Sequence, residues 1–274
     1  MHTRPQGVGI GLRACHYSYI EAERPTIPWF EVLSDNYLSQ SGPSFFHLEK
    51  IRAHYPITLH GVGMSLGSTD ALNISYLKKL KSLIQRTEPL LVSDHLCWTS
   101  FGDRYFHELL PLPFTEEAVV HTAKRIQYVQ DFLGRQIMIE NVSSYLQFAH
   151  STLREWEFLQ AVADEADCLI LLDINNIYVS AFNTGFHPEE YINHLSPQRI
   201  AQFHLAGFAD HGHYLLDTHG ASIHDPVWSL YEKAFKKLTP SAVCIERDNN
   251  IPDFQTLHRE IQRAQEVMNH AVTA

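Results

Sequence analysis

Eight short apolar runs, rich in Val, Ile and Leu, constrain the fold of this chain more than any other feature. They occupy residues 8–12, 29–33, 57–59, 90–93, 137–139, 168–172, 200–205 and 242–245. Longer stretches with helical periodicity separate them, which is the pattern of βα units around a parallel sheet. A doubly wound sheet shows the same alternation, but eight strands is the number of a closed barrel. The sequence therefore predicts an α/β fold, a (β/α)8 TIM barrel, formed by a single domain over residues 1–274.

Several of the separating stretches carry helix start and stop signals. Helices are expected at residues 74–86, 115–133, 153–164, 188–194, 226–237 and 254–270. Thr115 is placed to cap the second of these, and Gly134 to end it. Residues 206–224 show no clear secondary structure and are too long for an ordinary connection, which suggests a functional loop.

Composition excludes several classes of partner. The net charge of -10 and the lack of a Lys/Arg-rich segment argue against nucleic acid. No apolar run has the length of a signal peptide at the start of the chain or of a membrane span elsewhere, so we expect a cytoplasmic protein with no membrane partner. The four cysteines form no C-x-x-C pair, and three of them lie within or just beyond apolar runs, so we expect small buried thiols rather than disulfides or a thiolate zinc site.

Histidines and acidic residues stand where the predicted strands end. In a TIM barrel, side chains at the carboxyl ends of the strands form the active site. The positions are Glu31, His60, Asp94, His95, Glu140, Asp173, His204 and Glu246, and the long segment after the seventh run adds Asp217 and His219. Only Arg13 and Arg247 offer compensating positive charge there. So many carboxylates in one partly buried site would become protonated without a cation, so the pattern predicts a metal centre.

The number and type of these side chains narrow the choice of metal. A single catalytic zinc or iron takes about three protein ligands, so a larger set fits two or three ions. Imidazole and carboxylate donors without thiolate leave iron, manganese and zinc as candidates, and they disfavour copper(I) and iron–sulfur clusters.

Ten motifs around these positions resemble a known family. They are GIGLR (9–13), EVLSDNY (31–37), LHGVGMSLG (59–67), SDHL (93–96), LLPLP (109–113), ENVSSY (140–145), LDINN (172–176), HLAG (204–207), DTHG (217–220) and ERD (246–248). In these motifs the chain resembles the multinuclear non-heme iron-dependent oxidative enzymes, which include the oxidase of methanobactin biosynthesis. The resemblance covers nearly the whole chain.

The resemblance implies a xylose-isomerase-like barrel that binds two or three iron ions, as Fe2+ or Fe3+. The ligands that it implies are His60, His95, Glu140, Asp173, Asn176, His204, Asp217, His219 and Glu246. Asn176 is supported by the resemblance alone. Asp35 and Asp94 stand where the family commonly has Glu, and neither is an expected ligand.

The resemblance also implies an activity. Members of the family use iron, with O2 as co-substrate, to modify cysteine and in some cases other residues of ribosomally synthesised precursor peptides. A small partner protein usually binds the peptide. We therefore expect a peptide-modifying non-heme iron oxidoreductase, in which His60, Glu140, Asp173 and Asp217 carry the chemistry. An open position on Fe(II) would accept a substrate thiolate and O2 together, so no organic cofactor is expected.

Two other functions fit the same ligand pattern. A zinc or manganese TIM barrel of the endonuclease IV or xylose isomerase type would use these residues to activate water for hydrolysis or isomerisation. A peptide-binding scaffold without activity would hold its metals in closed, fully ligated sites.

The loop-borne pair Asp217 and His219 forms a separate expectation. If the segment is extended, alternate residues share a face, and the pair would clamp one ion from above the barrel mouth. Gly207, Gly212 and Gly220 would give the segment freedom to move. We expect this ion to be the most labile one.

Overall fold

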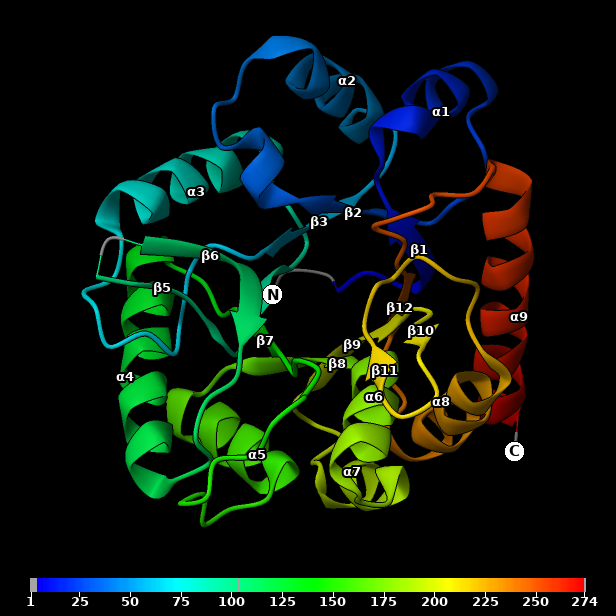
Figure 1. Cartoon of the computed structure of the whole chain (residues 1–274). Coiled ribbons are helices and arrows are strands. Elements are labelled where there is room, and N and C mark those ends of the chain that lie inside the picture. Colours follow the sequence, from blue (N-terminus) through cyan, green and yellow to red (C-terminus); the bar gives the residue numbers. More distant parts are fainter. Residues whose placement is uncertain (1–3, 103, 274) are drawn as a thin grey trace.

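The computed structural model describes residues 4–102 and 104–273, and in this part of the chain eight parallel strands close into a barrel (Figure 1). The strand order is β1-β12-β9-β8-β7-β4-β3-β2. The bounds are Gly7–Gly11 (β1), Phe30–Leu33 (β2), Ile57–Gly61 (β3), Val92–His95 (β4), Met138–Glu140 (β7), Leu169–Asp173 (β8), Ile200–Leu205 (β9) and Ala242–Ile245 (β12). Each strand overlaps one predicted apolar run, so the predicted TIM barrel is confirmed. The single domain over residues 1–274 stays a prediction, and residues 1–3, 103 and 274 lie outside the described residues.

The barrel strands are buried on both faces. Every residue of β3, β8 and β9 is buried, because helices cover the outside of the barrel and side chains fill the inside. Along β8, Ile170 and Leu172 belong to the large core beneath the helices. The alternate residues Leu169 and Leu171 join a small inner cluster with Leu91, Met138 and Ala201.

The outer helices surround the barrel in Figure 1. Their bounds are Tyr17–Glu23 (α1), Gly42–Arg52 (α2), Ile74–Thr87 (α3), Glu116–Leu133 (α4), Glu155–Ala166 (α5), Ile174–Thr184 (α6), Pro188–His194 (α7), Asp225–Leu238 (α8) and Phe254–Thr273 (α9). The six expected helices are confirmed as α3, α4, α5, α7, α8 and α9, with ends shifted by at most a few residues. The pattern did not predict α1, α2 and α6.

Local sequence signals explain why α4 was predicted and why α6 was not. Thr115 caps α4 by accepting a hydrogen bond from the Ala118 N–H, and Gly134 ends it in the left-handed conformation with φ of 74°, as expected. In α6 the capping residue is Asp173, which is also the last residue of β8 and accepts from the Asn176 N–H. No polar segment separates this strand from the helix, so the sequence lacks the turn residues that usually indicate the start of a new element, and α6 was not predicted.

Two antiparallel hairpins follow barrel strands at the mouth (Figure 1). β5 (Trp98–Phe101) pairs with β6 (Arg104–Leu110) after β4. β10 (Ala209–Asp210) pairs with β11 (Leu215–Leu216) after β9. The segment 206–224 therefore contains a short hairpin, which corrects the expectation that it lacks secondary structure.

A bulge shapes the inner face of β9. The β8–β9 register shifts between the pairs Ile170↔Ile200 and Leu171↔Gln202, so Ala201 is an extra residue in β9. Gln202 and His204 lie two residues apart and therefore share a face. Both contact Glu31 of β2, which places that face inside the barrel.

The barrel closes where its first strand meets its last. Gly7 of β1 pairs with Ala242 of β12. Just beyond this seam, Arg13 Nε donates to the Arg247 carbonyl oxygen at 2.7 Å. The seam, which is the pairing of β1 with β12, thus joins the first and last strands of the barrel directly beside Glu246.

The cysteines are free, and Cys97, Cys168 and Cys244 are buried, as expected from their apolar neighbours. In the described part of the chain, no helix combines the length and apolar character that crossing a membrane requires.

Candidate metal centre

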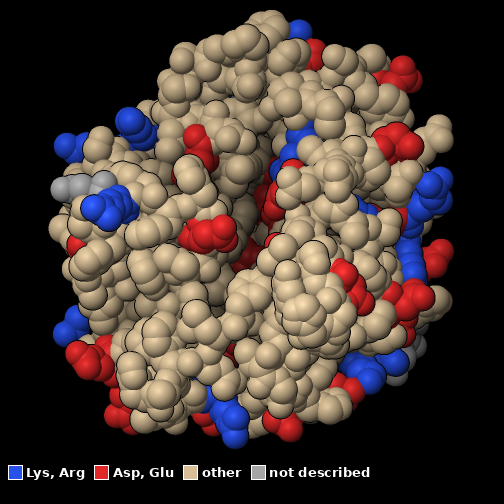
Figure 2. All heavy atoms as spheres, in the orientation of Figure 1, with Lys and Arg blue, Asp and Glu red and all other residues tan. Residues whose placement is uncertain are grey.

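Six expected ligands lie at the carboxyl ends of the barrel strands. They are His60 of β3, His95 of β4, Glu140 of β7, Asp173 of β8, His204 of β9 and Glu246 directly after β12. Each is 7% exposed or less. Because the strands are parallel, these ends meet at one face of the barrel. Figure 2 shows that this face is hollowed near its centre, with acidic side chains in the walls of the hollow.

Glu140 connects two parts of the site. Its Oε2 lies 3.2 Å from His60 Nε2 and 3.3 Å from His95 Nε2. Its Oε1 lies 3.4 Å from His204 Nδ1. One carboxylate therefore faces three imidazole rings.

Glu246 and His219 form the other part of the site. Glu246 Oε2 lies 2.9 Å from His204 Nδ1 and 3.2 Å from His219 Nδ1. The second nitrogen of His219, Nε2, lies 2.7 Å from Asp217 Oδ1 and 3.9 Å from Asp173 Oδ2. The loop-borne pair thus reaches the strand-end residues.

The geometry of that pair differs from the expected one. His219 has a φ of 48°, so the chain turns there and strand-like alternation does not bring the two side chains together. Gly207 also differs from expectation, because a Cβ there would lie 2.3 Å from the Ala221 carbonyl oxygen. Glycine at this position permits close backbone packing rather than movement.

Potential ligand atoms of the described residues gather in four overlapping groups: Glu31/His204/Cys244, His60/Glu140/His204, Glu140/Asp173/His204/Glu246 and His219/Glu246/Asp248. The second and third groups contain only expected ligands. Burial and then Glu31 raise the pKa of the Cys244 thiol well above the usual value, so without a cation this thiol is protonated.

Four buried polar atoms in these residues have no hydrogen-bond partner: Glu140 Oε2, Asp173 Oδ2, His204 Nδ1 and His219 Nε2. Buried polar atoms without partners are costly and rare. These four belong to the residues whose contacts define the site, and more than one bound cation would be needed to satisfy all of them, since His219 falls in a different group from the other three. The donor set therefore fits metal ions.

Neighbouring groups fix the orientation of two imidazoles. His95 Nδ1 lies 3.0 Å from the Gly61 carbonyl oxygen, which can only accept, so Nδ1 carries the proton and Nε2 offers a lone pair toward Glu140. His204 Nε2 lies 2.7 Å from Glu31 Oε1, which leaves Nδ1 free to face Glu140 and Glu246. Both rings present the nitrogen that a metal needs.

Glu31 is the residue whose role sequence reasoning missed. It is 3% exposed, and its Oε2 accepts from Gln202 Nε2 at 2.6 Å and from Thr58 Oγ1 at 3.2 Å. Burial raises the pKa of its carboxyl, but the His204 imidazole and the hydrogen bond from it outweigh burial and lower the pKa to about 2. Glu31 is therefore a buried carboxylate that orients His204, an outer partner of the kind that tunes metal ligands. The sequence showed an acid in this strand but not the partners on β9.

The other groups of the site divide into two sets. The surrounding carboxylates outweigh burial at His204 and His219 and raise the pKa of both imidazoles well above the usual value, whereas these imidazoles lower the pKa of Glu246 well below its own.

Burial decides the direction of the pKa shift at Asp173, His60 and His95. It raises the pKa of Asp173 well above the usual value, helped by Glu140 and Asp217, and it lowers the pKa of His60 and His95. A cation would reverse the effect on Asp173, because it stabilises the charged carboxylate.

Asn176 lies beside the site with its amide engaged. Its Nδ2 donates to the Asn141 carbonyl oxygen at 3.0 Å, and its Oδ1 accepts from Ser143 Oγ at 2.8 Å. Its assignment as a ligand stays a prediction. Asp35 and Asp94 instead accept from the backbone N–H groups of Val62 and Met64, so both acids hold the loop after β3.

The two arginines at the strand ends behave differently. Arg13 Nη2 lies 3.9 Å from Glu246 Oε1 and also contacts Asp248. Arg247 pairs with Glu260 of α9 instead. Only Arg13 of the two therefore balances charge near the site.

Comparison with known proteins gives a family match and close relatives. Residues 7–269 match the family described as RiPP precursor modification enzyme MbnB/TglH/ChrH, in which RiPP denotes a ribosomally synthesised and post-translationally modified peptide. A UPF0276 protein of Acaryochloris marina is 53% identical over 262 residues, covering 96% of this chain and 95% of that protein. A UPF0276 protein of Anaeromyxobacter sp. is 48% identical over 268 residues, covering 98% and 95%.

Solved structures share the fold at low identity. A D-tagatose 3-epimerase-like protein aligns with a TM-score of 0.63 at 17% identity, covering 97% of this chain and 99% of that one. Endonuclease IV from Thermus thermophilus aligns with a TM-score of 0.60 at 13% identity, also covering 97% and 99%. A xylose isomerase-like TIM barrel protein from Mycobacterium smegmatis aligns with a TM-score of 0.59 at 13% identity, covering 98% of each chain. These likenesses support the xylose-isomerase-like barrel.

Proposed function

Because this chain belongs to the MbnB/TglH/ChrH family of RiPP precursor modification enzymes, we propose that it is an iron-dependent enzyme that uses O2 to oxidise a cysteine residue of a precursor peptide. The proposal combines the family's peptide modification with the donor set at the barrel mouth. O2 is the oxidant, and two or three iron ions are the cofactor.

The position of Glu140 between His60 and His95 carries the proposal. Two imidazoles and one carboxylate form the donor set of non-heme Fe(II) oxygenases. Both Nε2 atoms lie within 3.3 Å of the same carboxylate oxygen, which has no hydrogen-bond partner. Asp173, His204, Asp217, His219 and Glu246 supply enough further donors for more than one ion.

The chain's own residues prepare the site. Gly61 and Glu31 hold His95 and His204 with the ligating nitrogen toward Glu140. Asp173, which burial favours in its protonated form, would release its proton when a cation binds. Iron, when bound, would supply a redox-active Lewis acid at which a thiolate and O2 can meet. His60, Glu140, Asp173 and Asp217 would surround that place.

The remaining parts of the proposal concern partners and location. A small partner protein would present the precursor peptide to the hollow at the barrel mouth. The enzyme would act in the cytoplasm, since free cysteines are typical of a reducing compartment.

The test begins with metal analysis of protein purified without oxygen. We expect more than one equivalent of iron and a mass change in a peptide encoded beside the gene, seen only with O2. Glu140→Gln and Asp173→Asn should lose both iron and activity while circular dichroism shows a folded barrel. Full turnover with zinc alone, or either variant retaining iron and turnover, would contradict the proposal.

A further inference from the structure

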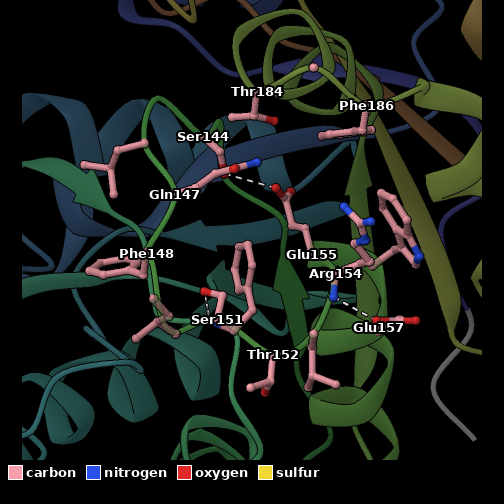
Figure 3. A pocket seen from close by; sticks show the side chains of 16 residues that line it. Ser144, Gln147, Phe148, Ser151, Thr152, Arg154, Glu155, Glu157, Thr184 and Phe186 are labelled. Atoms are coloured by element: carbon pink, nitrogen blue, oxygen red, sulfur yellow. Dashed lines mark hydrogen bonds between the residues drawn. The ribbon is translucent and has the colours of Figure 1, made fainter.

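A cavity of about 450 Å³ lies outside the metal centre, between the loop that follows β7 and the neighbouring ends of α5 and α6 (Figure 3). This volume is in the range of small-ligand pockets. The loop begins directly after Glu140, and its residue Ser144 lines the cavity. Only three residues therefore separate the candidate metal ligand Glu140 from Ser144 in the cavity wall.

Glu155, the first residue of α5, is the polar centre of this cavity. Its Oε2 accepts a hydrogen bond from Ser144 Oγ at 3.0 Å. Its Oε1 is buried without a hydrogen-bond partner, as is Nε1 of the adjacent Trp156. None of the ion pairs formed by the described residues includes Glu155. Figure 3 shows its carboxyl group projecting into the cavity toward Ser144.

Helix capping does not explain this carboxyl group. The exposed N–H of Arg154, the residue that caps α5, already donates to Glu157 Oε2 at 2.8 Å. Burial raises the pKa of Glu155 to about 7, although the hydroxyl groups of Ser144 and Tyr191 oppose the rise. The cavity thus holds an acid that lacks a cationic partner.

The walls of the cavity combine aromatic and aliphatic side chains with polar and charged ones, among them Arg154 and Glu157. Phe114, Phe148 and Phe186 line it, and Leu146, which is 53% exposed, stands at its rim. Aromatic side chains beside the unpaired carboxyl group of Glu155 suit a ligand with an alkyl stem and a positively charged end, and the two acids outnumber the one arginine in the lining.

We propose that this cavity binds a lysine or arginine side chain of the precursor peptide, with its cationic group on Glu155 and its stem along Phe114 and Phe186. The identity of the ligand as a peptide rests on the proposed function. A peptide bound here would have its lysine or arginine in the cavity and another residue in the metal centre. The distance between these two residues would be fixed, because Ser144 and Glu140 belong to one short segment.

The test uses iron-free protein and two short probes at about pH 8, where a carboxyl group of pKa near 7 is ionised. The peptides Ac-Gly-Lys-Gly-NH2 and its norleucine analogue share the alkyl stem but differ in the ammonium group. Calorimetric titration should show about tenfold tighter binding of the lysine peptide, the size of a charge-assisted hydrogen bond. An arginine peptide should also bind more tightly than the norleucine analogue.

Two variants locate the binding. Glu155→Gln keeps the shape of the side chain and should abolish the preference for lysine. Glu157→Gln is the matched control, because Glu157 is an exposed acid lining the same cavity, and it should keep the preference. Equal binding of the two peptides to the wild-type protein, which needs no variant, would overturn the inference. So would an unchanged preference in Glu155→Gln or its loss in Glu157→Gln. These outcomes leave the proposed function standing, whereas a protein that prefers lysine but neither binds iron nor modifies a peptide would overturn the proposed function alone.

Discussion

Replacing Glu31 tests whether an outer carboxylate governs metal binding at His204. In Glu31→Leu, His204 Nε2 loses the acceptor that lies 2.7 Å away, and the proton can move to Nδ1, the nitrogen that faces Glu140 and Glu246. In Glu31→Gln, an oxygen can still face His204. Gln202 Oε1 has no partner, so a rotated Gln202 amide can accept from the new amide group. Glu31→Gln should therefore weaken metal binding less than Glu31→Leu does.

The structure sets the size of each effect. Glu31→Gln removes the charge but keeps the hydrogen bond, so we expect about tenfold weaker metal binding, or about 1.4 kcal/mol. Glu31→Leu removes the acceptor altogether, and the loss should approach about a hundredfold, the upper end for outer-shell partners. Thr58→Val, which removes only the donor at 3.2 Å and keeps the charge, is the control and should bind metal nearly as well as the wild-type protein.

Equilibrium dialysis against limiting Fe(II) without oxygen, followed by metal analysis, gives the affinity. Thermal unfolding of the iron-free variants shows separately whether the barrel is intact. If Glu31→Leu is folded and binds iron like the wild-type protein, Glu31 does not orient a metal ligand and the reasoning is refuted.

Two further predictions concern His219 and Glu155. His219→Ala should remove one ion selectively, the most labile one, because His219 lies on a loop whereas the other histidines lie on strands; unchanged anomalous scattering at every site in crystals at the iron edge would exclude this. Glu155 has a pKa of about 7 in the folded protein, above the ordinary value of 4.5, so its ionisation destabilises the fold as pH rises from about 4.5 to 7, and the penalty is constant above that range. Glu155→Gln should therefore be more stable than the wild-type protein by about 1–2 kcal/mol at pH 8, less than the full shift implies because the side chain is partly exposed. This gain should vanish near pH 4.5 in denaturant titrations, and an equal gain at both pH values would count against a buried, raised-pKa acid.

Much of the metal centre could be predicted because the carboxyl ends of all strands in a TIM barrel lie on the same face. Once the eight runs are recognised, His60, Glu140 and Asp173 must lie on one face, whatever the helices do. The role of Glu31 could not be predicted in this way, because it depends on the bulge at Ala201 that sets the inner face of β9. A one-residue bulge does not visibly change the hydrophobic periodicity of the sequence, so it could not be predicted.

The remaining gaps have similar causes. The helix α6 was missed because Asp173 both ends a strand and caps a helix. The cavity around Glu155 could not be predicted because three separate segments meet there, residues 112–114, 144–157 and 184–186. Its acid also sits in the first turn of a helix, where acidic residues are common for reasons of helix stability alone.

The seam between β1 and β12 has a consequence for the assembly of the enzyme in the cell. Arg13 and Asp248, which meet across it, are 235 residues apart, and Glu246 follows the last barrel strand to leave the ribosome. A nascent chain that has already exposed His60, His95 and Glu140 still has an open sheet, with β1 and β9 each lacking a neighbour. Closing such a distant pair of strands is a slow, late step of folding. The complete set of donors therefore exists only after synthesis of the barrel, so a metal ion that needs all of them would bind the finished chain rather than the nascent one.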